Sequence, residues 1–205
     1  MSFAFLIDTF ATERLKTLNV WAQFPDSDLE FRPAPPARSV REQMVHQCLS
    51  EEAWFTKMLG LSVTVAALPT PETRLGFLRQ YAAASAARLD LLSAQSSDWF
   101  DAPTQFFDVP RSRAWVLVRR IAHSAHHRGQ LTTCHRLLGH SLYSTYGPTA
   151  DTGGLPAHGA SVVYRYGSVE ELLDAEARGG MNPPLPGPGA APVTERPGIV
   201  PPEGF

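Results

Sequence analysis

The sequence contains little cysteine, little lysine and no long apolar run. Its two cysteines, Cys48 and Cys134, are too few for a disulfide framework, and we expect both to be buried free thiols in helical segments. No run approaches the roughly 18 apolar residues that a membrane span needs. The formal net charge is only −2, which gives no general attraction to phosphate backbones or acidic membranes. The composition therefore excludes nucleic acid and membranes as expected partners.

The N-terminus also lacks the pattern of a secretory leader, because Asp8 interrupts the first apolar residues and no basic segment precedes them. We therefore expect a cytoplasmic protein. Of the 205 residues, 43% are hydrophobic and 19% are charged, which is the balance of a globular domain. We predict a helical bundle over residues 1–155, an extension with a short helix over 156–178, and a Pro/Gly-rich tail over 179–205. The tail is expected to be disordered or to lie across another surface.

Four long segments have the apolar periodicity of amphipathic helices. They run from about Phe3 to Phe24, from Ser39 to Gly60, from Pro71 to Ala94, and from Arg113 to Leu138. Ser39 with Glu42 forms a capping-box pattern, and Thr70 and Ser112 precede the third and fourth segments as further caps. The predicted fold class is all-α, a four-helix bundle followed by an irregular extension rich in proline and glycine.

Three smaller features accompany these helices. The aromatic stretch between Ser96 and Arg111 has room for a short extended piece, and a short helix is predicted from Ser168 to Arg178. Gly129 lies inside the fourth long helix, where glycine costs up to about 1 kcal/mol relative to alanine. We expect the close approach of a neighbouring helix to explain it.

His123 and His127 are the most informative pair in the chain. They lie four residues apart in the fourth helix, so their imidazoles rise from one face, about 40° apart around the axis and about 6 Å apart along it. This spacing suits the chelation of one metal ion. A third ligand must come from another helix, and His46 in the second helix is the upstream histidine that can close the site. The expected metal ligands are therefore His46, His123 and His127.

Neighbouring polar residues leave alternatives open. His126 is close to His123 at i,i+3 but lies about 100° from His127 around the axis, so we place it beside the site or at a subunit surface. Arg120 lies on the histidine side of the helix, where it either meets an anionic substrate or forms internal ion pairs. Glu42 or Ser50 could orient His46 from the same helix face.

Three imidazoles with one open position resemble a reactive zinc site more than a closed structural one, which usually recruits thiolates. The expected cofactor is a divalent metal ion, with zinc or nickel the preferred identity. The open position allows a bound water or thiol to ionise near neutral pH. Either of these would give the site a nucleophile.

The same residues carry a resemblance to the DinB-like family of damage-inducible, metal-binding four-helix bundle proteins. It rests on His46, on the run His123-Ser124-Ala125-His126-His127-Arg128-Gly129-Gln130-Leu131, and on Gly147-Pro148-Thr149-Ala150-Asp151, and it covers about residues 1–155. The resemblance implies an up-down-down-up bundle, a homodimer, and a metal triad at His46, His123 and His127. The region from Leu155 onward departs from the usual shorter chain.

Three functions are compatible with these observations. The first is a metal-dependent enzyme, a thiol S-transferase that joins a low-molecular-weight thiol to a small electrophile, because some members of the family have such activity. The second is a non-catalytic metal-binding protein of the stress response, whose ion braces the bundle. The third is a metal-dependent hydrolase, for which the sequence names no general base.

Overall fold

The computed structural model describes residues 3–196. The chain forms two compact units, residues 1–134 and residues 135–205, and each is described separately. The first unit holds four long helices, as predicted. They are α1 (Ala4–Ala22), α2 (Val40–Ala53), α3 (Arg74–Ser93) and α5 (Arg113–Leu137), the last of which extends three residues beyond the unit.

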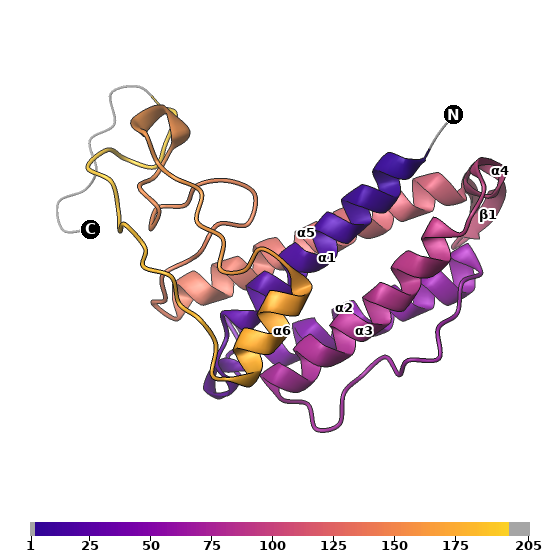
Figure 1. The fold of residues 1–205 in the computed structure, drawn as a ribbon, viewed down its shortest axis with the longest axis horizontal. Helices are drawn as coiled ribbons and strands as arrows, with labels where there is room; N and C mark the ends of the chain where they lie inside the picture. Colours follow the sequence, from indigo (N-terminus) through magenta and orange to yellow (C-terminus); the bar gives the residue numbers. More distant parts are fainter. Residues whose placement is uncertain (1–2, 197–205) are drawn as a thin grey trace. The chain divides into compact units, whose positions relative to one another are not determined.

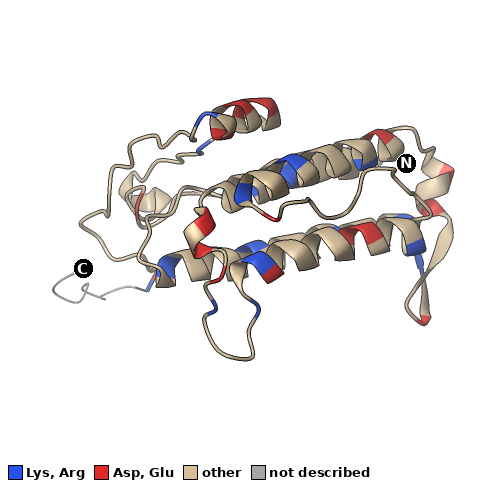
Figure 2. Cartoon of the chain, turned by 90° about the horizontal axis from the view of Figure 1, so that it is seen from below, with Lys and Arg blue, Asp and Glu red and all other residues tan. Residues whose placement is uncertain are grey.

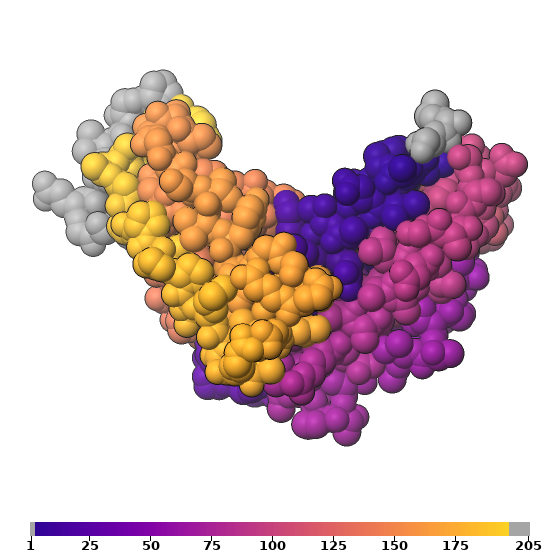
Figure 3. Space-filling view, in the orientation of Figure 1, coloured from indigo at the N-terminus to yellow at the C-terminus, as the bar shows by residue number. Residues whose placement is uncertain are grey.

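The four helices form a bundle in which α2 and α3 run in the same direction (Figure 1). The connection over residues 60–73 makes this possible, because it returns the chain along the bundle before α3 begins. The helix α5 then reverses direction, and α1 lies beside α3 (Figure 3). The prediction of an all-α, up-down-down-up four-helix bundle is confirmed.

Local signals in the sequence explain several helix ends. The hydroxyl of Ser39 accepts a hydrogen bond from the amide of Glu42, whose carboxylate accepts one in return, so the predicted capping box is complete. After Ala53 the helix α2 continues as a π-helix, η2 (Trp54–Leu59), and Gly60 ends it in the left-handed conformation with φ 73°. Ser112 caps α5 through the amide of Trp115.

The aromatic stretch between α3 and α5 contains more structure than predicted. A short helix, α4 (Ser97–Asp101), precedes an antiparallel hairpin of β1 (Pro103–Phe106) and β2 (Val109–Ser112). The hydroxyl of Thr104 bonds the carbonyl of Met58, which ties the hairpin to the end of η2. This hairpin therefore stands beside the π-helix that continues α2.

An apolar core fills one end of the bundle. Its buried members come from α1, η2, the connection after η2, α3, α4 and α5, and they are Leu6, Phe10, Phe55, Leu59, Leu61, Leu92, Phe100, Val116 and Leu117. Burying this many large aliphatic and aromatic side chains supplies the main driving force for bundle formation. The polar groups considered below lie farther along the same helices.

Two expectations about the helices are wrong. The helix α3 begins at Arg74 rather than at Pro71, because the side chain of Thr73 accepts a hydrogen bond from the amide of Gly76 and so provides the cap. Gly129 is not a site of close helix approach, since a Cβ atom at this residue would meet nothing within 4 Å. Its carbonyl instead accepts bonds from the hydroxyls of Thr132 and Thr133.

The second unit is largely irregular. It contains a short 3₁₀ turn, η3 (Pro156–His158), and α6 (Val169–Ala177), whose N-cap Ser168 accepts a bond from the amide of Glu171. Through residue 196 part of the Pro/Gly-rich tail is fixed within this unit, since Gly187 donates to the carbonyl of Asp151. The remainder of the predicted tail, residues 197–205, lies outside the described residues.

Charged residues of both signs are spread along the long helices of the first unit (Figure 2). This agrees with the small formal net charge of −2. In the part of the chain that the structure describes, no helix combines the length and apolar character needed to cross a membrane.

Candidate metal centre

Three histidines from two helices converge on one point. One nitrogen each of His46, His123 and His127 lies within 4.8 Å of the other two. His46 comes from α2, and the other two come from successive turns of α5. The Nε2 atoms of His123 and His127 are 3.2 Å apart, and the ring of His46 is centred 4.6 Å from that of His127. The donor set fits a divalent metal ion, because three imidazole nitrogens are this close together.

Two glutamines set the orientation of His127. Its Nδ1 atom lies 2.8 Å from Oε1 of Gln43 and 2.8 Å from Oε1 of Gln130. Amide oxygens only accept hydrogen bonds, so Nδ1 must carry the proton and donate it. The unshared electron pair of His127 is consequently on Nε2, the atom that faces His123. The amide of Gln43 also donates to Gln130, which holds the two acceptors in place.

His123 is held from the opposite side by Arg120. A guanidinium always donates, so its approach to within 3.3 Å makes Nδ1 of His123 an acceptor and assigns the ring proton to Nε2. That proton lies between the two Nε2 atoms. A cation held by Nε2 would need the unshared electron pair of that atom, so the ring proton would have to shift to Nδ1 and Arg120 would have to release its contact there.

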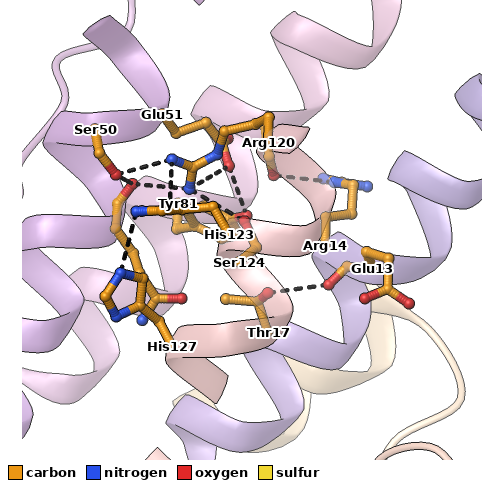
Figure 4. Close-up of polar contacts among 12 residues, drawn as sticks. Glu13, Arg14, Thr17, Ser50, Glu51, Tyr81, Arg120, His123, Ser124 and His127 are labelled. Atoms are coloured by element: carbon orange, nitrogen blue, oxygen red, sulfur yellow. Dashed lines mark hydrogen bonds and ion pairs between the residues drawn. The ribbon is translucent and has the colours of Figure 1, made fainter. Parts of the chain in front are cut away.

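Arg120 itself belongs to a buried network around Glu51 (Figure 4). The carboxylate of Glu51 is fully buried; it lies 3.6 Å from Arg120 and 3.1 Å from Arg88, and it accepts a bond from Tyr81. Arg120 also donates to the hydroxyls of Ser50 and Ser124. Buried charges need this degree of pairing to offset their desolvation. The network thus fixes Arg120, and Arg120 in turn fixes His123.

All three imidazoles are neutral at neutral pH. Burial is the main reason that the pKa of His123 falls to about 3 and that of His127 to about 4, and Arg120 lowers both further. Burial also lowers the pKa of His46, with Arg38 and Arg120 adding to the effect. Neutral imidazoles are the form that binds metals.

A pocket of about 720 Å³ opens beside the triad. Its walls include His46 and His123 and the aromatic side chains of Trp54, Phe106 and Phe107. The ring of Trp54 is centred 5.5 Å from the ring of His123, so the aromatic part of the lining lies directly beside one of the three histidines. This size suits a small molecule.

Comparison with known proteins agrees with the fold. The model of the DinB family matches residues 2–153, which is most of the chain. The chain belongs to the DinB family. The resemblance inferred from the histidine-containing run of α5 is therefore confirmed. A search among curated proteins found no match.

Solved structures show the same fold at low sequence identity. A DinB-like protein from Bacillus cereus is 20% identical, with a TM-score of 0.63 over 70% of this chain and 97% of its own. A DinB-like protein from Bacillus subtilis is 14% identical, with a TM-score of 0.54 over 67% of this chain and 94% of its own. YfiT from Bacillus subtilis, described as a probable metal-dependent hydrolase with an unusual four-helix bundle topology, is 19% identical, with a TM-score of 0.53 over 69% and 91%.

The other residues singled out in the sequence of this DinB-family chain lie outside the triad. His126 is exposed and lines the aromatic pocket, beside the site as expected. Arg120 forms the internal ion pair rather than a pocket contact. Cys48 is buried, which raises its pKa to about 12, and burial also raises the pKa of Cys134, so neither is a thiolate at neutral pH.

Neither predicted partner of His46 is bound to it by a hydrogen bond in the described structure. Glu42 completes the cap of α2 and pairs with Arg32, and Ser50 accepts from Arg120. The contacts of Gln43 and Gln130 with His127 were not predicted, although each glutamine lies three residues from a triad histidine on the same helix. The i,i+3 spacing on one helix was the signal in the sequence that could have indicated a glutamine beside a histidine.

Proposed function

We propose that this protein is a divalent-metal-dependent enzyme acting on a small molecule. His46, His123 and His127 would hold the ion, and zinc or nickel is the proposed identity because imidazole nitrogens suit both. The observation that carries the proposal is the convergence of three neutral imidazoles, two of which, His46 and His123, line a pocket of about 720 Å³. When bound, such an ion supplies Lewis acidity that makes a water or a thiol more acidic.

The reaction that we favour is the transfer of a low-molecular-weight thiol to a small electrophile. The thiol loses its proton to the solvent, its sulfur forms a bond to carbon, and a halide leaves or an epoxide oxygen takes up a proton. The pocket suits this chemistry, because Trp54, Phe106 and Phe107 offer an apolar surface to the electrophile. Hydrolysis is the second candidate, and the description of YfiT favours it. However, the described lining of the pocket includes no carboxylate to serve as a general base.

A turnover assay separates the two reactions. Protein loaded with zinc or nickel is incubated with glutathione, bacillithiol or mycothiol and a model halide or epoxide, and separately with activated esters and amides. We expect thioether formation by the loaded wild-type protein and loss of turnover in a His127→Ala variant. Ester or amide cleavage without thioether formation would replace the transferase by the hydrolase. No turnover above the variant in any arm would remove the enzyme proposal.

A bracing role for the ion is a third candidate, favoured by the origin of the ligands on two separate helices. If ligation links α2 to α5, removing the metal should destabilise the bundle. At a metal concentration about 1,000 times Kd the ion contributes about 4 kcal/mol, so we expect chelation to lower Tm by about 10 °C. Differential scanning calorimetry with and without chelator checks this. An unchanged Tm together with retained metal-dependent turnover would exclude bracing.

The glutamines around His127 should control metal affinity. Replacing Gln43 and Gln130 together by leucine removes both acceptors of the Nδ1 proton, so the ring loses its fixed tautomer and orientation. We expect the zinc Kd to rise about 10–100-fold, measured by competition with a chromophoric chelator. The matched control is Gln43→Glu, which keeps an acceptor and should keep the affinity. An unchanged Kd in the double leucine variant would mean that the glutamines do not position His127.

A further inference from the structure

The turn of the hairpin holds an aromatic residue in a conformation that favours glycine. Phe107 and Asp108 connect β1 to β2, and Phe107 has φ 54°. Within residues 3–196 it is the only residue other than glycine with positive φ. Bulky side chains rarely adopt this region because Cβ crowds the backbone. A two-residue hairpin turn itself requires positive φ at its first central residue, so the unusual feature is that phenylalanine rather than glycine occupies this place.

The side chain of Phe107 is placed on the pocket rather than in the core. It is 71% exposed, yet its ring is centred 4.8 Å from that of Phe106 and 6.5 Å from that of Trp54. Trp54 and Phe106 are themselves 5.2 Å apart, edge to face. The three rings make one aromatic wall that extends from His123 to the tip of the hairpin. Such a wall favours a planar apolar ligand.

The same pocket has a positive charge without a partner of opposite sign. Arg119 is exposed and lines the pocket, and its guanidinium lies 5.8 Å from the centre of the Trp115 ring. No ion pair involves Arg119 among the residues that the structure describes. Since no carboxylate is found in the described lining either, an anionic group on the ligand would find a donor in Arg119 and no repulsion.

We propose that the pocket binds a small molecule that combines a planar apolar ring with an anionic group. The ring packs against Phe107, Phe106 and Trp54, and the anion pairs with Arg119. Phe107 is thereby a specificity-determining residue, whose strained backbone presents its ring to the ligand. The inference rests on the proposed function, because it names the class of substrate for that site.

Binding of two probe ligands tests the inference without requiring turnover. The probes are 2-naphthoate and its neutral analogue 2-naphthamide, titrated by calorimetry into the full-length protein with and without added zinc. We expect 2-naphthoate to bind more tightly than 2-naphthamide in both metal states. Phe107→Ala should weaken naphthoate binding about tenfold, and Arg119→Gln should weaken it about threefold with little effect on the amide. The Phe107→Trp variant, which keeps an aromatic ring, should bind naphthoate about as tightly as the wild type.

Matched variants separate the pocket from general effects. Phe5→Ala removes another exposed phenylalanine, and Arg111→Gln removes another cation beside Trp115, and neither residue lines the pocket. Both should bind naphthoate like the wild type. Phe107→Gly should lose binding as Phe107→Ala does, but melt about 2–4 °C higher than Phe107→Ala because glycine relieves the positive φ.

The experiment distinguishes a failure of the ligand proposal from a failure of the proposed metal centre. Naphthoate binding that depends on Phe107 in protein that binds no zinc would support the pocket and remove the metal centre. Zinc binding without saturable naphthoate binding, or naphthoate binding unchanged in Phe107→Ala, would overturn the inference and leave the metal centre in place. Equal binding of naphthoate and naphthamide would overturn the anionic part.

Discussion

Replacing Glu51 by alanine is expected to destabilise the first unit by about 3–5 kcal/mol. Glu51 is the carboxylate between Arg88 and Arg120, at 3.1 Å and 3.6 Å, and all three side chains are almost fully buried. Its removal leaves two buried guanidinium groups without a counter-charge and the hydroxyl of Tyr81 without its acceptor. A loss of this size is a large part of a typical stability of about 5–15 kcal/mol. Urea denaturation followed by circular dichroism measures it.

The control is an exposed carboxylate in the same unit. Glu30 pairs with Arg41, but its side chain is 73% exposed, so Glu30→Ala should cost no more than about 1 kcal/mol. The Glu51→Gln variant keeps the shape and some hydrogen bonding but not the charge, and should lie between the two. Equal urea midpoints for Glu51→Ala and Glu30→Ala would show that the buried network does not stabilise the fold.

Replacing any triad histidine by alanine is expected to raise the zinc Kd more than about 100-fold. This exceeds the rise of about 10–100-fold expected when Gln43 and Gln130 are replaced. His46, His123 and His127 each present one nitrogen within 4.8 Å of the others, so each variant leaves two of three ligands. Two imidazoles leave a divalent ion under-coordinated. Titration against a chromophoric chelator measures the three constants, with circular dichroism to establish that each variant is folded.

His126→Ala is the matched control for these variants. Its ring is centred 5.1 Å from that of His127, yet it lies outside the group of converging nitrogens and lines the pocket. We expect its zinc Kd to stay within about threefold of the wild type. If His46→Ala bound zinc as tightly as the wild type while the α5 variants did not, the third ligand would have to come from elsewhere.

The ends of several helices could be predicted because their signals are local, whereas the up-down-down-up order was predicted only from the family resemblance. The capping box of Ser39 and Glu42, the left-handed stop at Gly60 and the cap at Ser112 each depend on a few adjacent residues. The start of α3 was predicted wrongly at Pro71, because Thr70 followed by proline has the pattern of a helix start. Thr73, three residues later, is the residue that caps the helix. Whether Gly129 meets a neighbour depends on packing, which the sequence does not contain.

The three histidines of the candidate site could be predicted from the sequence, but the residues that support them could not. The pair His123 and His127 follows from helix geometry, and His46 follows from the need for a third ligand, and the structure brings all three together. Their role as ligands stays a prediction. The supporting contacts of Gln43 and Glu51 could not be predicted, because they join residues 87 and 69 positions apart, Gln43 to Gln130 and Glu51 to Arg120. The homodimer implied by the resemblance also stays a prediction.

The most direct test of the metal centre is elemental analysis of the full-length protein, purified without an affinity tag and dialysed against metal-free buffer. We predict about one divalent ion per chain, zinc or nickel, and its absence from His46→Ala and His127→Ala protein prepared in parallel. Wild-type protein that retains no metal, even after loading with excess zinc or nickel and dialysis, would contradict a metal centre at the three histidines.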